Sequence, residues 1–130
     1  MVNELTERGA RVDGIYFCPH ALDAGCACRK PALGMFERAA REHDLDLRRS
    51  VVVGDRETDL LAAQAMGCAG VLVLTGYGRE ERARLDQWNG YRPTRIADDL
   101  ADAVGWWLEH TSNFRLQIAD CRLLNLQSAI

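Results

Sequence analysis

Four residues that can bind a soft metal ion lie close together in the first quarter of the sequence. Cys18 and His20 form a C-x-H pair, and Cys26 and Cys28 form a C-x-C pair a few positions later. Three thiolates and one imidazole make a closed tetrahedral zinc set with no open position for a reacting water, so the sequence predicts a structural zinc site. Free thiols or a disulfide are the alternatives, and free thiols do not explain why His20 lies among the cysteines.

An acidic motif, Gly54-Asp55-Arg56-Glu57-Thr58-Asp59, follows a β-branched run and opens a helical pattern. Asp55 at the end of a strand offers the carboxylate oxygen that Mg²⁺ prefers in proteins. Asp59, one helical turn later, is a direct or supporting partner of the same ion. The alternative is that Asp55 is only the N-cap of the helix, a position at which Asp is favoured.

The third candidate group is basic. Of the 16 lysine and arginine residues only Lys30 is a lysine, and it stands in Arg29-Lys30-Pro31 between the cysteine-rich loop and the next helical pattern. A compact ammonium group beside Mg²⁺ is what phosphoryl transfer needs, because negative charge spreads over the phosphoryl oxygens. Arg29 can bind a phosphate or hydroxyl as a planar fork. Solvated basic residues before a turn are the alternative.

The elements that must position these residues follow an alternating pattern. Residues 18–33 show no periodicity and form a loop. Strand patterns cover 14–17, 50–53, 71–74 and 94–97, and helical patterns cover 1–8, 34–43, 57–66, 79–88 and 98–109. The apolar run at 50–53 is typical of a strand buried on both faces. Alternating strands and helices predict an open parallel α/β sheet, and such sheets bind ligands beyond the carboxyl ends of their strands.

Composition excludes several classes of protein. A chain of 130 residues with 48% hydrophobic and 27% charged residues is ordinary for one globular domain. A net charge of −3 argues against a nucleic-acid binder. No apolar stretch is long enough to cross a bilayer, and the N-terminus lacks a secretory pattern, so we expect no membrane contact and a cytoplasmic location. We expect one domain over 1–111 and an unassigned tail over 112–130.

Four segments together resemble the haloacid dehalogenase superfamily of phosphatases: DGIYFCPH, CACRKPALGM, VVVGDRETD and VLVLTGYG. They look most like the D-glycero-D-manno-heptose 1,7-bisphosphate phosphatase branch. The histidinol-phosphatase branch, a close relative, shares the zinc loop and the GDR-x-x-D segment. The resemblance implies an α/β fold, a Rossmann-like open parallel sheet of the haloacid dehalogenase type with a zinc loop. It also implies a Mg²⁺-dependent phosphomonoesterase that acts on a small sugar phosphate.

The resemblance also implies a role for each candidate residue. Lys30 stabilises the phosphoryl group and, with Asp55, belongs to the catalytic set. Arg29 and Arg56 approach the substrate together with Lys30. The implied metal ligands are Asp55 for Mg²⁺ with Asp59 in support, and Cys18, His20, Cys26 and Cys28 for the structural Zn²⁺.

The sequence departs from the superfamily pattern at one point. The superfamily begins with a strand ending in D-x-D-G-T, whose first Asp attacks phosphorus, and a second strand binds the phosphoryl group; neither occurs here. We therefore expect a fold truncated at the N-terminus, with a gap between the 14–17 and 50–53 strands, and an isolated chain without activity. Another chain supplying that portion is the expected partner. A histidinol-phosphate phosphatase fragment or a non-catalytic zinc-binding module are the alternative functions.

Overall fold

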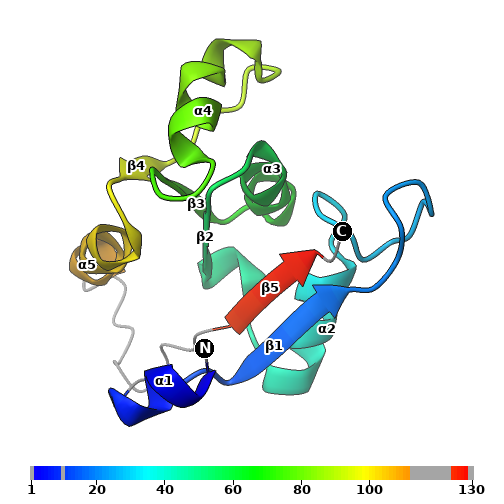
Figure 1. Ribbon diagram of the computed structural model, residues 1–130, viewed down its shortest axis with the longest axis vertical. Coiled ribbons are helices and arrows are strands. Elements are labelled where there is room, and N and C mark those ends of the chain that lie inside the picture. The colour runs from blue at the N-terminus through cyan, green and yellow to red at the C-terminus, as the bar shows by residue number, and fades with distance from the viewer. Residues whose placement is uncertain (1, 10, 112–123, 129–130) are drawn as a thin grey trace. The chain divides into compact units, whose positions relative to one another are not determined.

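The computed structural model describes residues 2–9, 11–111 and 124–128, and they form two compact units (Figure 1). The first unit comprises Met1–Asp44 and Leu116–Ile130, and the second comprises Leu45–Arg115. In the described parts of the chain, every helix is too short or too polar to cross a membrane.

The first unit is built around two strands. The strands β1 (Gly14–Cys18) and β5 (Leu124–Ser128) run parallel, with Gly14 opposite Leu124 and Cys18 opposite Ser128 (Figure 1). Two helices belong to the same unit, α1 (Val2–Glu7) and α2 (Gly34–His43). β5 lies in the tail over 112–130 that the sequence left unassigned. Residues 112–123 and 129–130 of that tail lie outside the described residues.

One face of β1 is buried and the other is exposed. Tyr16 and Cys18 are buried, whereas Ile15 and Phe17, which alternate with them, are exposed. The helix α2 packs against β1 and buries Met35, Phe36 and Ala39. These positions recur at helical spacing, which is why the sequence predicted this helix with the correct bounds.

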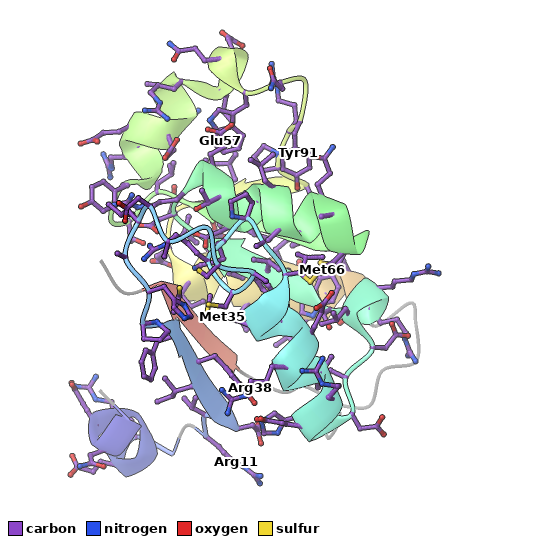
Figure 2. All side chains as sticks on the ribbon, turned by 90° about the vertical axis from the view of Figure 1, so that its right-hand side faces the viewer. Arg11, Met35, Arg38, Glu57, Met66 and Tyr91 are labelled. Atoms are coloured by element: carbon purple, nitrogen blue, oxygen red, sulfur yellow. The ribbon has the colours of Figure 1, made fainter. Side chains whose placement is uncertain are left out.

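A polar cluster joins α2 to the buried face of β1. The Tyr16 hydroxyl donates to Glu42 Oε2 at 2.5 Å, and Arg38 Nε donates to Glu42 Oε1 at 2.8 Å. Figure 2 labels Arg38 on α2, and its guanidinium lies 5.5 Å from the centre of the Tyr16 ring. The hydrogen bond from Tyr16, followed by that from Arg38, holds the pKa of Glu42 below its ordinary value of 4.5.

This cluster predicts a pH-dependent contribution to stability. Because folding lowers the pKa of Glu42, the contribution is complete above pH 4.5 and is lost as the pH falls through the lower folded value. We expect Glu42→Gln to destabilise the chain near pH 7 and to differ little from the wild type near pH 3. Urea unfolding at both pH values measures this. Glu37→Gln, on the same helix and exposed, is the control, and an equal loss from Glu42→Gln at both pH values would contradict the prediction.

The second unit contains a three-stranded parallel sheet in the order β2-β3-β4. In the register, Val51 lies opposite Ala69 and Val71 opposite Arg95. The elements of this unit, in chain order, are a 3₁₀ turn at Leu47–Arg49, β2 (Val51–Gly54), α3 (Glu57–Met66), β3 (Ala69–Val73), α4 (Gly78–Ala83), a 3₁₀ turn at Leu85–Gln87, β4 (Arg95–Ala97) and α5 (Leu100–Thr111).

The central strand β3 supports a core on each of its faces. Val71 and Val73 pack with Ala97 and Ala103 on one face. Leu72 packs with Leu60 and Trp88 on the other. Burial on both faces is typical of parallel sheets in α/β proteins and confirms the predicted fold class for this unit.

Three local expectations need correction or refinement. The valines of β2, expected to be buried on both faces, are only half-buried because β2 is an edge strand of its sheet. The expected helix over 79–88 ends at Ala83, since the chain turns through a 3₁₀ segment and inserts Trp88 into the core. Among the described strands, β1 and β2 belong to separate sheets, and the expected gap between them stays a prediction.

Candidate functional site

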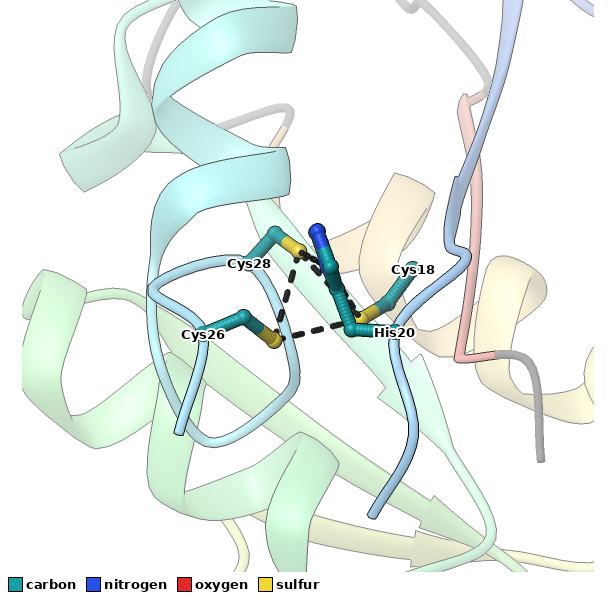
Figure 3. Close-up of side chains that lie close together, drawn as sticks. All are labelled: Cys18, His20, Cys26 and Cys28. Atoms are coloured by element: carbon teal, nitrogen blue, oxygen red, sulfur yellow. Dashed lines mark hydrogen bonds between the residues drawn. The ribbon is translucent and has the colours of Figure 1, made fainter. Parts of the chain in front are cut away.

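The cysteine-rich loop brings its four predicted metal ligands together at the end of β1. Cys18 Sγ lies 3.4 Å from Cys26 Sγ and 3.2 Å from Cys28 Sγ, and the last two sulfurs are 3.5 Å apart (Figure 3). His20 Nδ1 lies 3.6 Å from Cys18 Sγ and 3.2 Å from Cys28 Sγ. All four ligand atoms lie within 4.8 Å of one another.

These distances fit a tetrahedral zinc ion. Zn–S bonds of about 2.3 Å require sulfur atoms about 3.8 Å apart at the corners of a tetrahedron. The observed separations are slightly shorter, so a small expansion of the cluster is enough to admit the ion. Cys18 is completely buried while His20 is exposed, so the cluster has one side in the protein and one side in solvent.

The three thiols share hydrogen bonds, and this sharing shifts the pKa values of Cys26 and Cys28 in opposite directions. The hydrogen bond with Cys18 lowers the pKa of Cys26 to about 6. The pKa of Cys28 rises to about 12, first because it hydrogen-bonds to Cys18 and then because burial disfavours its thiolate. Such a cluster binds a cation by releasing thiol protons, which is the chemistry of a zinc site.

Two contacts inside the first unit brace this loop. The Arg29 Nη2 donates to the carbonyl oxygen of His20 at 2.6 Å. The Gly34 N–H donates to the carbonyl oxygen of Ala27 at 3.0 Å, which ties the start of α2 to the chain between two cysteines. A Cβ on Gly34 would lie 2.6 Å from that same oxygen, so only glycine permits this approach.

Substitution of Gly34 tests how tightly the loop is held. We expect Gly34→Ala to push the Ala27–Cys28 backbone away from α2 and to cost about 1–3 kcal/mol, the usual cost of overpacking. The matched control is Gly105→Ala, because a Cβ there would meet no atom within 4 Å. Thermal unfolding of both variants measures the effect, and equal midpoints for Gly34→Ala and the wild type would show that the loop moves freely.

The predicted magnesium ligand Asp55 stands directly after β2 and reaches toward the loop that follows β3. Its Oδ2 accepts a hydrogen bond from the Tyr77 N–H at 2.9 Å. Gly76, with φ +57°, leaves room for this carboxylate, since a Cβ at Gly76 would collide with Asp55 Oδ2. The Asp55 carboxylate thus lies at the carboxyl ends of two neighbouring strands, which is where open parallel sheets bind their ligands.

The N-cap interpretation of Asp55 is wrong. The N-cap of α3 is Arg56, and the carboxylate that turns back to it belongs to Asp59, whose Oδ2 accepts the Arg56 N–H at 3.3 Å. Asp59 is buried, with 6% of its surface exposed. Its contact fixes the start of the helix directly after Asp55, and its role in binding magnesium stays a prediction.

The remaining predicted site residues are basic. Arg56 is exposed, and its guanidinium stacks 3.9 Å from the centre of the Tyr77 ring. Lys30 is half-buried and precedes Pro31 through a cis peptide bond. The structure thus groups the cysteine loop with Arg29 in the first unit, and Asp55, Arg56 and Asp59 in the second. Sequence reasoning missed Tyr77, although its place in Thr75-Gly76-Tyr77-Gly78 after a strand was a usable signal.

Comparison with known families identifies the fold. Residues 27–103, more than half of the chain, match the model of the HAD-hydrolase-like family. This chain belongs to the HAD-hydrolase-like family. The match includes Lys30 and the whole acidic motif after β2, and it confirms the resemblance to haloacid dehalogenases.

The curated relatives that the chain matches include heptose-1,7-bisphosphate 7-phosphatases and a bifunctional protein of histidine biosynthesis. The chain is 46% identical over 101 residues to the D-glycero-β-D-manno-heptose-1,7-bisphosphate 7-phosphatase of Bordetella bronchiseptica, matching 78% of this chain and 55% of that protein. It is 45% identical over 112 residues to the corresponding enzyme of Thermosynechococcus vestitus, matching 78% of this chain and 57% of the relative. The histidine biosynthesis bifunctional protein HisB of Buchnera aphidicola is 38% identical over 78 residues, 60% of this chain and 22% of HisB.

A solved structure from the same family has a similar fold. It is the D,D-heptose 1,7-bisphosphate phosphatase of B. bronchiseptica, crystallised with magnesium and phosphate, with a TM-score of 0.74 and 44% sequence identity. The match covers 85% of this chain and 60% of that one. The HAD-hydrolase-like chain therefore spans little more than half the length of the relatives that it matches.

Proposed function

We propose that this chain is the metal-binding portion of a Mg²⁺-dependent phosphatase that removes one phosphate from a heptose bisphosphate. The observation that carries the proposal is the Asp55 carboxylate, held at the carboxyl end of β2 by the Tyr77 N–H. Support comes from the similarity to a phosphatase that was crystallised with magnesium and phosphate.

The surroundings of Asp55 fit a magnesium ion. Its Oδ2 is occupied by the Tyr77 N–H, and among the described residues its Oδ1 accepts no hydrogen bond. The residue is half-buried, so an ion from solvent can reach a carboxylate that the Tyr77 N–H holds in place. Carboxylate oxygen is the donor that Mg²⁺ prefers, and the bound ion would neutralise charge on a phosphoryl group.

The other proposed roles follow from charge and position. Lys30 stabilises the phosphoryl oxygens as charge develops on them, and Arg29 and Arg56 bind the substrate. Asp59 supports the metal site by fixing the helix that begins after Asp55. No D-x-D-G-T segment occurs in residues 1–130, so we propose that turnover requires the nucleophilic Asp of such a segment in addition to the residues described above.

We also propose that Zn²⁺ binds to Cys18, His20, Cys26 and Cys28 and that its role is structural. The four ligand atoms fill a tetrahedral set, which leaves no position for a substrate or a reacting water. Zinc would fix the chain just before Arg29 and Lys30. We place the protein in the cytoplasm, where thiols remain reduced and available to a metal.

Complementation in trans tests the proposed reaction. The full 130-residue chain is mixed with the portion of the B. bronchiseptica enzyme that it does not match, in the presence of Mg²⁺ and Zn²⁺. We expect phosphate release from D-glycero-D-manno-heptose 1,7-bisphosphate and none from histidinol phosphate. Each component alone is the control.

Two outcomes would replace the proposal. Release from histidinol phosphate with the heptose bisphosphate left intact would favour the histidinol-phosphatase reading, which the similarity to HisB supports. Formation of the mixed complex with one zinc per chain but without turnover would favour a non-catalytic zinc-binding module.

A further inference from the structure

Tyr77 contacts two neighbouring residues of the proposed site in two different ways. Its backbone N–H donates to Asp55 Oδ2 at 2.9 Å, and its ring lies under the Arg56 guanidinium, 3.9 Å from ring centre to carbon. Asp55 and Arg56 follow β2, whereas Tyr77 follows β3. Tyr77, which follows β3, therefore contacts both the Asp55 carboxylate and the Arg56 guanidinium, which follow β2.

The backbone around Tyr77 is itself constrained. Gly76 has φ +57°, and a Cβ there would collide with the Asp55 carboxylate. A Cβ on Gly78 would collide with the carbonyl oxygen of Val73, at the end of β3. These two close approaches leave little freedom for the loop, so the position of the Tyr77 backbone is set by its contacts with the strand ends.

The stack changes what Arg56 can do. An arginine at an exposed helix start samples many rotamers, and a ligand that binds it must first pay the entropy of ordering it. The Tyr77 ring, half of which is exposed, orders the guanidinium before any ligand arrives while leaving its N–H donors at the rim free to face solvent. A planar, pre-oriented guanidinium next to a metal-binding carboxylate is suited to a phosphate.

We propose that Tyr77 is a positioning residue, which holds the Arg56 guanidinium beside Asp55 so that Arg56 binds a phosphate group of the substrate. This inference rests on the proposed function, and it assigns to the aromatic residue of the T-G-Y-G loop a part in substrate affinity rather than in metal binding. A substitution of the Tyr77 side chain leaves the hydrogen bond to Asp55, the proposed metal ligand, in place, because the backbone N–H of Tyr77 donates it.

Calorimetric titration of the full chain tests this division of roles, with inorganic phosphate as the probe in the presence of saturating Mg²⁺. We expect Tyr77→Ala to weaken phosphate binding about two- to fivefold, the range of an exposed cation–π contact, and Tyr77→Phe to bind like the wild type. Mg²⁺ titrated alone should bind equally to all three proteins. In an Arg56→Ala background, Tyr77→Ala should have no further effect on phosphate affinity.

Each opposite result has a definite meaning. Equal phosphate affinity of Tyr77→Ala and the wild type, or an undiminished effect of Tyr77→Ala in the Arg56→Ala background, would overturn the inference while the proposed function stands. A wild-type chain that binds Mg²⁺ but no phosphate would overturn the proposed function and this inference with it. Far-UV circular dichroism of every variant checks that the fold is retained.

Discussion

Removal of zinc is expected to unfold the loop between β1 and α2, with a loss of stability on the order of 10 kcal/mol. The reason lies in the small size of the apolar core around this loop. Among the described residues the sheet next to this loop has two strands, and a two-stranded sheet is marginal in water without further support. Cys18 is fully buried at the end of β1, so the metal would join the strand to the start of α2.

The measurement compares thermal unfolding of the zinc-loaded chain with and without a chelator. Cys28→Ser should reproduce the effect of the chelator and reduce the zinc content, since a hydroxyl is a poor ligand for this ion. Cys68→Ser is the matched control, because that half-buried thiol lies outside the cluster and donates to the Ala63 carbonyl oxygen instead. Identical unfolding with and without the chelator would exclude a structural zinc ion.

Asp55→Asn is expected to lower Mg²⁺-dependent phosphate release by about 10²–10³-fold in the complemented enzyme. The amide oxygen can still accept the Tyr77 N–H, so the local structure should persist while the negative charge is lost. Mg²⁺ affinity, measured by titration calorimetry on the chain alone, should fall with the activity.

Two further variants show whether the loss is specific. Asp86→Asn removes a carboxylate that is fully exposed and paired with Arg92, and it should leave both activity and Mg²⁺ affinity unchanged. Lys30→Arg keeps the positive charge but replaces a compact ammonium with a planar guanidinium. Because the two groups differ in shape, we expect this variant to lower turnover while Mg²⁺ affinity is unchanged. Full Mg²⁺ affinity in Asp55→Asn would show that the metal lies elsewhere.

The parts of the fold that depend on nearby residues were predictable from the sequence. The helices 34–43 and 57–66 have the expected bounds because their apolar spacing and their flanking residues are local signals. The position of β5 was not predictable, since its partner β1 is remote in the sequence and its own residues follow neither period. The burial of Trp88 likewise depends on Leu60 and Leu72, which belong to other elements.

The same distinction holds for the candidate site. The four candidate zinc ligands lie in one short loop, so their clustering could be predicted from spacing alone. The placement of the Asp55 carboxylate could not, because it depends on the Tyr77 N–H, which lies 22 residues further along the chain, and the role of Asp55 as a metal ligand stays a prediction. Whether Lys30 and Arg29 contact a substrate stays a prediction, since it depends on a bound molecule.

The pairing of β1 with β5 has a consequence for the order in which the chain can fold during synthesis. Gly14 cannot form its strand pairing until Leu124 has been made, because the two residues are partners in the first unit's sheet. The second unit is continuous in the sequence from Leu45 to Arg115, so its strand pairings depend on no residue made after Arg115. The proposed magnesium site therefore needs no later segment, whereas β1 with its exposed Phe17 lacks its partner strand until Ser128 has been made, and until then it is available to chaperones.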